Sequence, residues 1–366
     1  MTIDLTDPST APSLDLALEV FPADVRRTLV QQASWRRQIA RSNPSLEFIA
    51  TGLGSWTPGS TVTVGFYGGD AELHRQIAEA TTQLTDACNV ELCFGQDSAT
   101  GRYRSWSERD DSYSADIRVS FDQPGFWSHV GMDSIDPTIG APGGLVGGRP
   151  HQRSMNLGGF DLHLPVRWER TVRHEFMHAL AFHHAHMNTG SVCRGEFRWD
   201  DDDGYVRTRD DGSFIADTEG RRPGIYTYMS GAPNNWTREM IDRNLRTIEP
   251  ASMAASPFDS ASIMLYRFPE LFYQTSPSPC APIGYGVDLS DADKRGLARL
   301  YPYDLSQIDA LIERAVTARH ALAALAPVPD LSYLEASSAL PATDDEWALG
   351  ATVVLDRFLK GHQPCQ

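Results

Sequence analysis

The sequence predicts an α+β protein, because strand and helix patterns both occur along the chain and long irregular segments interrupt them. Residues 61–67 alternate apolar and polar side chains with the period of a half-buried strand. Residues 71–84 carry apolar side chains at helical spacing behind Asp70, which can cap the first turn. Residues 187–260 are instead loop-rich. We therefore expect a sheet with helices in the first half of the chain and an irregular region after it.

Both ends of the chain add helices. Residues 22–41 begin with a proline suited to a first helical turn and place apolar side chains on one face. Asn-Pro at 43–44 ends this helix. Near the carboxyl end, one amphipathic helix follows Tyr303 and another spans residues 347–359. We expect these helices to pack on the central part of the chain.

The composition excludes several classes of partner. The 366 residues carry a net charge of −16, which argues against binding to nucleic acid or to anionic membrane surfaces. No apolar run approaches the length of a membrane span, so we expect no membrane insertion. The amino terminus lacks the basic region and apolar core of a secretion signal. The expectation is a cytoplasmic protein or one exported by a leaderless route, while the oligomeric state stays open.

Five cysteines leave at least one thiol unpaired. Cys193 and Cys280 could tie the loop-rich insertion to its domain, and Cys88 and Cys93 are close in sequence. Cys365, near the end of the chain, is the expected free thiol. Disulfides would indicate an oxidising compartment.

The most informative stretch is residues 174–184, which read His-Glu-Phe-Met-His-Ala-Leu-Ala-Phe-His-His. A helix places side chains four apart on one face, so His174 and His178 can present two imidazoles to one metal ion. Glu175 lies about 100° further round the helix. There it can border the metal without ligating it, which is where a general base for a metal-bound water belongs.

His184 lies six residues beyond His178, too far round a continuous helix to join the pair easily. A sharp turn after Leu180 would return it as a third ligand and leave the fourth zinc position for water. A bare His-Glu-x-x-His match also arises by chance, and His183 and His186 are interpreted as ordinary polar residues beside the site. The third histidine at this offset favours a zinc site.

The spacing resembles the extended metzincin pattern, His-Glu-x-x-His-x-x-Gly-x-x-His, with Ala181 where the family has glycine. That glycine ends the helix in a left-handed conformation, which costs alanine about 1 kcal/mol. A second match is the segment 258–266, whose Ser-Ile-Met-Leu-Tyr core resembles the Met-turn of the astacins and their bacterial relatives. In isolation, residues 263–265 would more readily fit a buried strand, but the zinc motif upstream favours the Met-turn. The resemblance implies that Met264 underlies the zinc site and that Tyr266 ligates zinc or stabilises the oxyanion.

The resemblance covers residues 51–303 and implies a metzincin-like catalytic domain. Its upper part, to about residue 181, would hold a twisted mixed sheet with backing and active-site helices, above a loop-rich lower part, 182–303. Residues 1–50 would be an amino-terminal extension and candidate pro-segment, and residues 304–366 a helical extension. The family's edge strand, expected to pair with an extended substrate, would comprise Ser154, Met155, Asn156, Leu157 and Gly158.

One departure from the family bears on activation. Astacins carry glutamate directly after the third histidine, where it meets the mature amino terminus, and this chain has Ala185 there. The departure argues against activation by burial of a new amino terminus. If the chain is latent, residues 1–50 would cover the cleft. That segment contains no cysteine, and its acidic candidates for a blocking group include Asp4, Asp7 and Asp24.

The resemblance implies a zinc-dependent metalloendopeptidase that acts on proteins or peptides. Glu175 would take a proton as a zinc-bound water attacks the scissile carbonyl, and Tyr266 would stabilise the oxyanion. Two alternatives stay open: a latent or dedicated processing protease for one specific precursor, and a catalytically silent zinc-binding interaction domain. Residues 200–204 could offer oxygen ligands to Ca²⁺, but the EF-hand spacing is absent, so a solvated acidic loop is the favoured interpretation.

Overall fold

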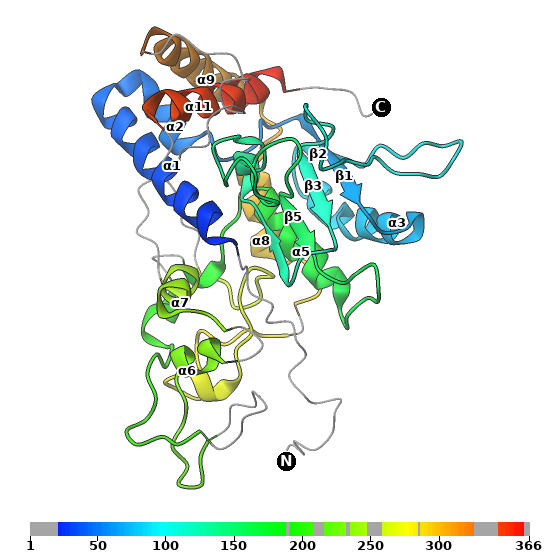
Figure 1. Cartoon of the computed structure of the whole chain (residues 1–366). Coiled ribbons are helices and arrows are strands. Elements are labelled where there is room, and N and C mark those ends of the chain that lie inside the picture. Colours follow the sequence, from blue (N-terminus) through cyan, green and yellow to red (C-terminus); the bar gives the residue numbers. More distant parts are fainter. Residues whose placement is uncertain are drawn as a thin grey trace. The chain divides into compact units, whose positions relative to one another are not determined.

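A mixed five-stranded sheet confirms the predicted α+β class (Figure 1). The strand order is β2-β1-β3-β5-β4. The first four of these strands run parallel to their neighbours, and β4 runs antiparallel to β5. The bounds are β1 Ser60–Tyr67, β2 Val90–Cys93, β3 Ile117–Ser120, β4 Phe126–Ser128 and β5 Met155–Leu157.

The computed structural model describes residues 21–187, 191–207, 216–231, 235–246, 258–284, 286–325 and 343–361. These residues separate into two compact units. Residues 183–292 form one unit, and the described residues on both sides of that range form the other, which contains the sheet.

Two helices of the sheet-containing unit carry the features that the sequence predicts there. Helix α3 (Ala71–Ala80) is capped by Asp70, whose side chain accepts a hydrogen bond from the Leu73 N–H at 2.8 Å. Helix α5 (Trp168–Ala179) contacts α3 and packs on β4 and β5 (Figure 1). The short helix α4 (Thr82–Thr85) follows α3. The sheet therefore supports helix α5, which contains His174 and His178.

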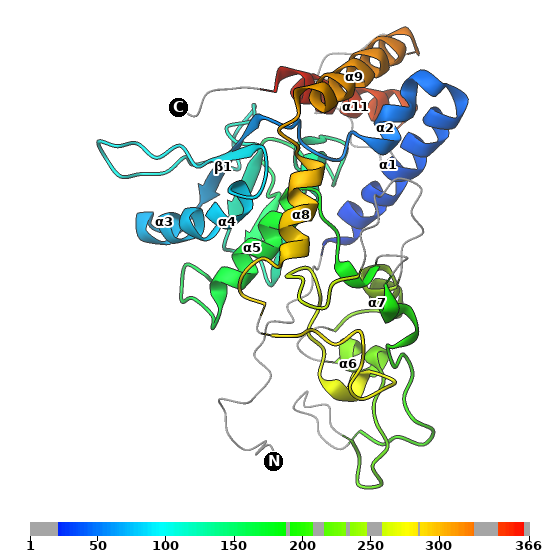
Figure 2. The ribbon, with the colours of Figure 1, turned by 180° about the vertical axis from the view of Figure 1, so that it is seen from behind.

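The terminal helices belong to the same unit and contact one another, as Figures 1 and 2 show for α1, α2, α9 and α11. The predicted helices near both ends of the chain are thereby confirmed. Their bounds, with those of the short helices and of α8, are α1 Ala23–Ser42, η1 Pro44–Leu46, α2 Glu47–Thr51, η2 Gly131–Ile135, α8 Asp291–Leu300, α9 Leu305–Leu325 and α11 Asp344–Lys360.

Helix α1 is tied into this unit by buried polar contacts. The Gln32 side-chain amide donates to the Asp136 carboxylate at 2.6 Å, and the Arg36 guanidinium donates to the same carboxylate at 3.1 Å. Asp24 accepts a hydrogen bond from the Ala141 N–H at 2.9 Å. Asp24 therefore serves as an anchor of α1 rather than as the blocking group considered from the sequence. The other two candidate blockers, Asp4 and Asp7, lie outside the described residues.

The unit of residues 183–292 consists mostly of loops and short helices, as the sequence predicts. Its helices are η3 Ala185–Met187, η4 Val192–Gly195, α6 Ile225–Ser230, α7 Arg238–Leu245 and η5 Glu270–Phe272. A core of buried apolar and aromatic side chains joins them, including Phe197, Ile225, Met229, Phe272 and Tyr273.

A disulfide between Cys193 and Cys280 closes this core, which is the pairing considered from the sequence. Cys93 is also disulfide-bonded, so it does not pair with its sequence neighbour Cys88. Cys88 is a free, buried cysteine, and burial raises the pKa of its thiol to about 12. This thiol therefore stays protonated and unreactive at neutral pH. Cys365 lies outside the described residues.

Carboxylates of the acidic loop 200–204 bond other residues of the chain. Asp202 forms ion pairs with Arg198 and Arg222, and it accepts a hydrogen bond from the Arg222 N–H at 2.7 Å. Asp201 accepts a hydrogen bond from the Gly224 N–H at 2.7 Å. Ca²⁺ ligation, which the sequence allowed but did not favour for this loop, stays untested. Separately, none of the helices in the described part of the chain has both the length and the apolarity that crossing a bilayer requires.

Candidate metal centre

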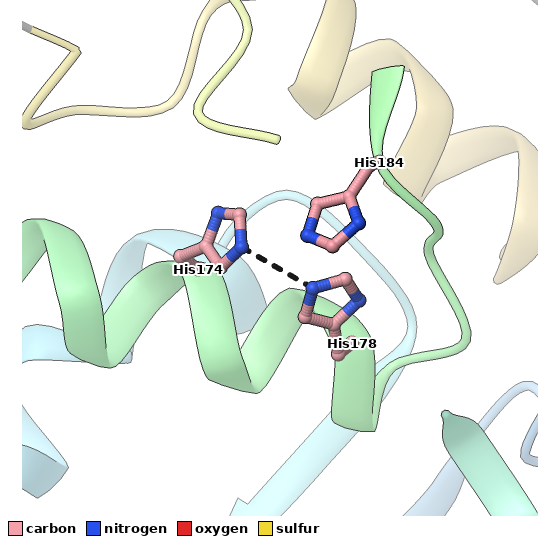
Figure 3. Close-up of side chains that lie close together, drawn as sticks. All are labelled: His174, His178 and His184. Carbon is pink, nitrogen blue, oxygen red and sulfur yellow. Dashed lines mark hydrogen bonds between the residues drawn. The ribbon is translucent and has the colours of Figure 1, made fainter. Parts of the chain in front are cut away.

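Helix α5 carries two of the predicted ligands on one face. His174 and His178 are both buried, and their Nε2 atoms lie 3.2 Å apart (Figure 3). Two nitrogens bound to one tetrahedral zinc at about 2.0–2.1 Å would lie about 3.3 Å apart. The helical spacing thus produces a pair of nitrogens at the separation that a shared ion requires.

The helix ends where the sequence predicts a turn. Ala181 adopts a left-handed conformation with φ of 69°, as the family's glycine would. The Phe182 N–H donates to the Met177 carbonyl at 3.0 Å, and the Ala181 N–H donates to the His178 carbonyl at 2.8 Å. This pair of bonds is a Schellman motif, with alanine at the position that usually holds glycine. The predicted sharp turn after Leu180 is confirmed.

The third histidine lies close to the first two. His174, His178 and His184 are all buried and offer three ring nitrogens within 4.8 Å of one another. Figure 3 shows the three rings turned toward a common point. Three imidazole nitrogens are a donor set that zinc accepts, with one coordination position left over. Among the described residues, no other group of histidine, cysteine and carboxylate side chains offers a metal three or more ligands in this way.

The orientation of His178 is set by the turn itself. Its Nδ1 lies 2.7 Å from the carbonyl oxygen of Phe182. A carbonyl can only accept, so Nδ1 carries the proton and Nε2 keeps its lone pair for a metal. A backbone carbonyl that holds the second nitrogen of a ligating histidine is a common feature of metal sites.

Glu175 is the residue that the sequence predicts as a general base. It follows His174 on α5 and is 3% exposed. A carboxylate this deeply buried is shielded from bulk water.

The predicted Met-turn is a buried turn rather than the alternative strand. Residues 263–266 are all buried and lie outside the strands of the structure. The Met264 carbonyl accepts a hydrogen bond from the Ala185 N–H at 2.9 Å, and the Met264 N–H donates to the Ser262 hydroxyl at 3.1 Å. The Met-turn is thus bonded to the residue that directly follows His184.

His184 is surrounded by aromatic rings, and one of them, His186, was not predicted from the sequence to pack there. The Tyr266 ring lies 4.2 Å from the His184 ring, centroid to centroid. His186, interpreted from the sequence as an ordinary polar neighbour, is buried and stacks on His184 at 5.3 Å and lies 4.8 Å from Tyr266. Its burial could not be inferred from spacing, because it depends on the Met-turn some eighty residues later.

The predicted edge strand is an inner strand. In β5, Met155 and Asn156 pair with β3 on one side and with β4 on the other. Ser154 also bonds backbone on both sides, to Arg118 and His129, whereas the Gly158 N–H donates to the Gly125 carbonyl. The segment expected at the edge, Ser154, Met155, Asn156, Leu157 and Gly158, therefore contains an inner strand, and the antiparallel β4 takes the edge position.

Comparisons with known proteins find likeness only at the level of structure. One structure of myroilysin is 24% identical to this chain; the match covers 69% of this chain and 97% of that one, with a TM-score of 0.48. A second structure of myroilysin is also 24% identical; the match covers 69% of this chain and 87% of that one, with a TM-score of 0.39. High choriolytic enzyme 1, described as a hatching enzyme zinc-protease from the medaka fish Oryzias latipes, is 16% identical, with 68% of this chain and 94% of that chain covered and a TM-score of 0.36. No protein-family model and no curated protein matches the chain.

Proposed function

We propose that this protein is a zinc-dependent endopeptidase of the metzincin type, with the astacins as its nearest family by motif. The observation that carries the proposal is the set of three buried imidazoles within 4.8 Å, with a buried glutamate next to the first of them on the same helix. The Met-turn match at residues 262–266 supports the family assignment.

The donor set determines which metal suits the site. Three neutral nitrogens without a thiolate or a carboxylate are typical of catalytic zinc sites. When bound, zinc supplies Lewis acidity toward a water molecule and toward the carbonyl of the scissile peptide bond. His174, His178 and His184 would hold the ion.

Glu175 is the proton carrier of the proposed reaction. Its carboxylate accepts a proton from the water molecule as the water oxygen attacks the peptide carbonyl carbon. It then delivers that proton to the amide nitrogen as the carbon–nitrogen bond breaks, so the amine leaves neutral and the carboxylate is restored. Burial of Glu175 keeps this proton from being lost to solvent.

Tyr266 is the proposed donor to the substrate's carbonyl oxygen as that oxygen gains negative charge. Its side chain is 7% exposed, and the stacked rings of His184 and His186 limit the positions that the phenol can take. The role is carried over from the Met-turn motif and makes Tyr266 the second catalytic residue of the proposal.

The experiment compares Glu175→Ala with a control, Glu169→Ala, which removes a carboxylate from the first turn of the same helix. Both variants are analysed for bound zinc and for cleavage of a peptide library. We expect Glu175→Ala to retain zinc and to lose at least about a hundredfold in cleavage rate, the usual contribution of general acid–base catalysis. The control should keep both properties. Retained turnover in Glu175→Ala would overturn the proposal.

The same library separates the alternatives. Cleavage of a single peptide with no activity on others would point to a dedicated processing protease. Zinc binding by the unmodified protein without cleavage of any peptide would point to a silent zinc-binding domain and would contradict the proposed activity.

A further inference from the structure

The last turn of α5 is capped by two side chains from distant parts of the chain. The Trp56 indole N–H donates to the Ala179 carbonyl at 2.7 Å, and the Tyr301 hydroxyl donates to the Leu180 carbonyl at 3.0 Å. Trp56 is 1% exposed and Tyr301 is fully buried. Together with the Schellman bonds to Met177 and His178, these contacts satisfy the four carbonyls that a helix end leaves without partners.

The packing around Ala181 shows how this turn accommodates a methyl group. A Cβ added to Gly131 would lie 2.9 Å from the Ala181 Cβ and 1.9 Å from the Gly54 carbonyl oxygen. The Met132 N–H donates to the same Gly54 oxygen at 3.0 Å and fixes that backbone. The Ala181 methyl therefore packs where only a glycine at position 131 leaves room.

We propose that Trp56 and Tyr301 are positioning residues, which hold the left-handed turn at Ala181 and thereby set where His184 enters the metal centre. The metal role in this inference rests on the proposed function. The left-handed conformation costs alanine free energy that it does not cost glycine, so other contacts must stabilise the turn. Loss of either donor would leave a buried carbonyl without its partner, which is costly.

The turn acts on two ligands at once. Residues 181–183 are the whole connection between the end of the helix and His184, so a change at Ala181 moves the third ligand. The Phe182 carbonyl, which holds the Nδ1 of His178, belongs to the same turn. Burial raises the pKa of Tyr301 well above its ordinary value, so its hydroxyl remains a donor across the pH range of any assay.

The experiment uses the full chain with Tyr301→Phe, which removes the donor and keeps the ring, and with Trp56→Phe, which removes the donor and replaces the indole by a smaller aromatic ring. The matched control is Tyr303→Phe, because the Tyr303 hydroxyl donates to a backbone carbonyl of Cys88 at 2.8 Å, away from the turn. Each substitution is also combined with Ala181→Gly. Zinc affinity is measured by competition with a chelator, and the visible spectrum of the cobalt-substituted protein reports the ligand geometry.

We expect about tenfold weaker zinc binding in Tyr301→Phe and Trp56→Phe, the usual scale for groups that orient metal ligands, and an altered cobalt spectrum. Ala181→Gly should restore both, because glycine needs no support at this turn. The inference is overturned if both variants bind zinc like Tyr303→Phe, or if Ala181→Gly restores nothing.

A readout without metal keeps this inference separate from the proposed function. Hydrogen exchange of a peptide covering residues 176–183 should be faster in Tyr301→Phe than in Tyr303→Phe, and slower again after Ala181→Gly. If the unmodified protein bound no zinc, the proposed function would fail, while this exchange would still test the support of the turn. Equal exchange in both variants would reject the positioning role.

Discussion

The Nδ1 of His178 lies 2.7 Å from the carbonyl oxygen of Phe182, so a backbone group four residues later selects the ring nitrogen that carries the proton. The carbonyl belongs to the left-handed turn at Ala181, whose φ is 69°. The turn that ends the helix therefore also orients a ligand on that helix. Such coupling would make the proposed metal centre sensitive to residues that do not ligate the ion.

His184→Ala should abolish stoichiometric zinc binding. The substitution removes one of three clustered donors, and two imidazoles hold zinc far more weakly than three. We expect a loss of affinity beyond the about 10- to 100-fold typical of groups outside the ligand set. Isothermal titration of the metal-free protein measures the loss, with His183→Ala as the neighbouring control. Unchanged affinity in His184→Ala would remove this residue from the ligand set.

Tyr266→Phe should slow peptide cleavage while leaving zinc in place. The substitution keeps the ring that packs 4.2 Å from His184 and removes only the proposed oxyanion donor. Loss of one such donor lowers kcat by about 10²–10³-fold in well-studied hydrolases. Steady-state kinetics with a metal assay on the same sample would show the effect. A variant with normal kcat would mean that another group serves the oxyanion.

His129 should make the protein less stable as the pH falls. Burial, and then the nearby charge of Arg118, lower the pKa of His129 to about 3, against about 6.5 in an unfolded chain. Its ring packs against Phe21 and Trp127, where a charge is unfavourable. A group with a lowered folded-state pKa contributes stability that is present above about pH 6.5 and is lost as the pH falls toward 3.

The comparison is between His129→Phe and the unmodified protein. As the pH falls from 6 to 4, the free energy of unfolding of the unmodified protein should decrease by about 1.4 kcal/mol per pH unit relative to that of His129→Phe. Denaturant titrations at several pH values measure it, and the shared titration of the zinc-site histidines cancels in the difference. A difference that does not vary with pH would show that His129 is accessible to protons in the folded state.

Removal of α1 should destabilise the protein rather than activate it. Val25 and Thr28 are fully buried, and Gln32 and Arg36 bond the buried Asp136. A chain that starts at residue 45 would expose this surface, at a cost of several kcal/mol. Thermal unfolding of that chain is compared with one that starts at residue 21 and keeps α1. Equal stability together with higher peptidase activity would instead identify α1 as a removable pro-segment.

Several local features of the fold could be predicted from the sequence pattern alone. The alternation at residues 61–67 corresponds to β1, and Asp70 caps α3 as its residue type suggests. The four-residue spacing of His174 and His178 on a helix placed their nitrogens together, because helix geometry is set by bonds within one segment. These features need no information from other parts of the chain.

Strand order could not be predicted in the same way. The resemblance places a strand at residues 154–158, but its position between β3 and β4 depends on pairing with residues 27 to 36 positions earlier in the chain. A strand of three residues carries no signal that distinguishes an inner position from an edge. The expected edge strand was wrong for this reason.

By itself, the sequence determined the identity and spacing of the candidate ligands and of the candidate general base, because those depend on residue type and helix geometry, whereas the Met-turn was identified by its resemblance to a known family. Only the tertiary structure decided that alanine can hold a left-handed turn at position 181, with Trp56 and Tyr301 as donors 123 and 121 residues away from the carbonyls they cap. The physical reason is that a helix end leaves its last carbonyls without partners, and which distant side chains reach them depends on how the whole chain packs.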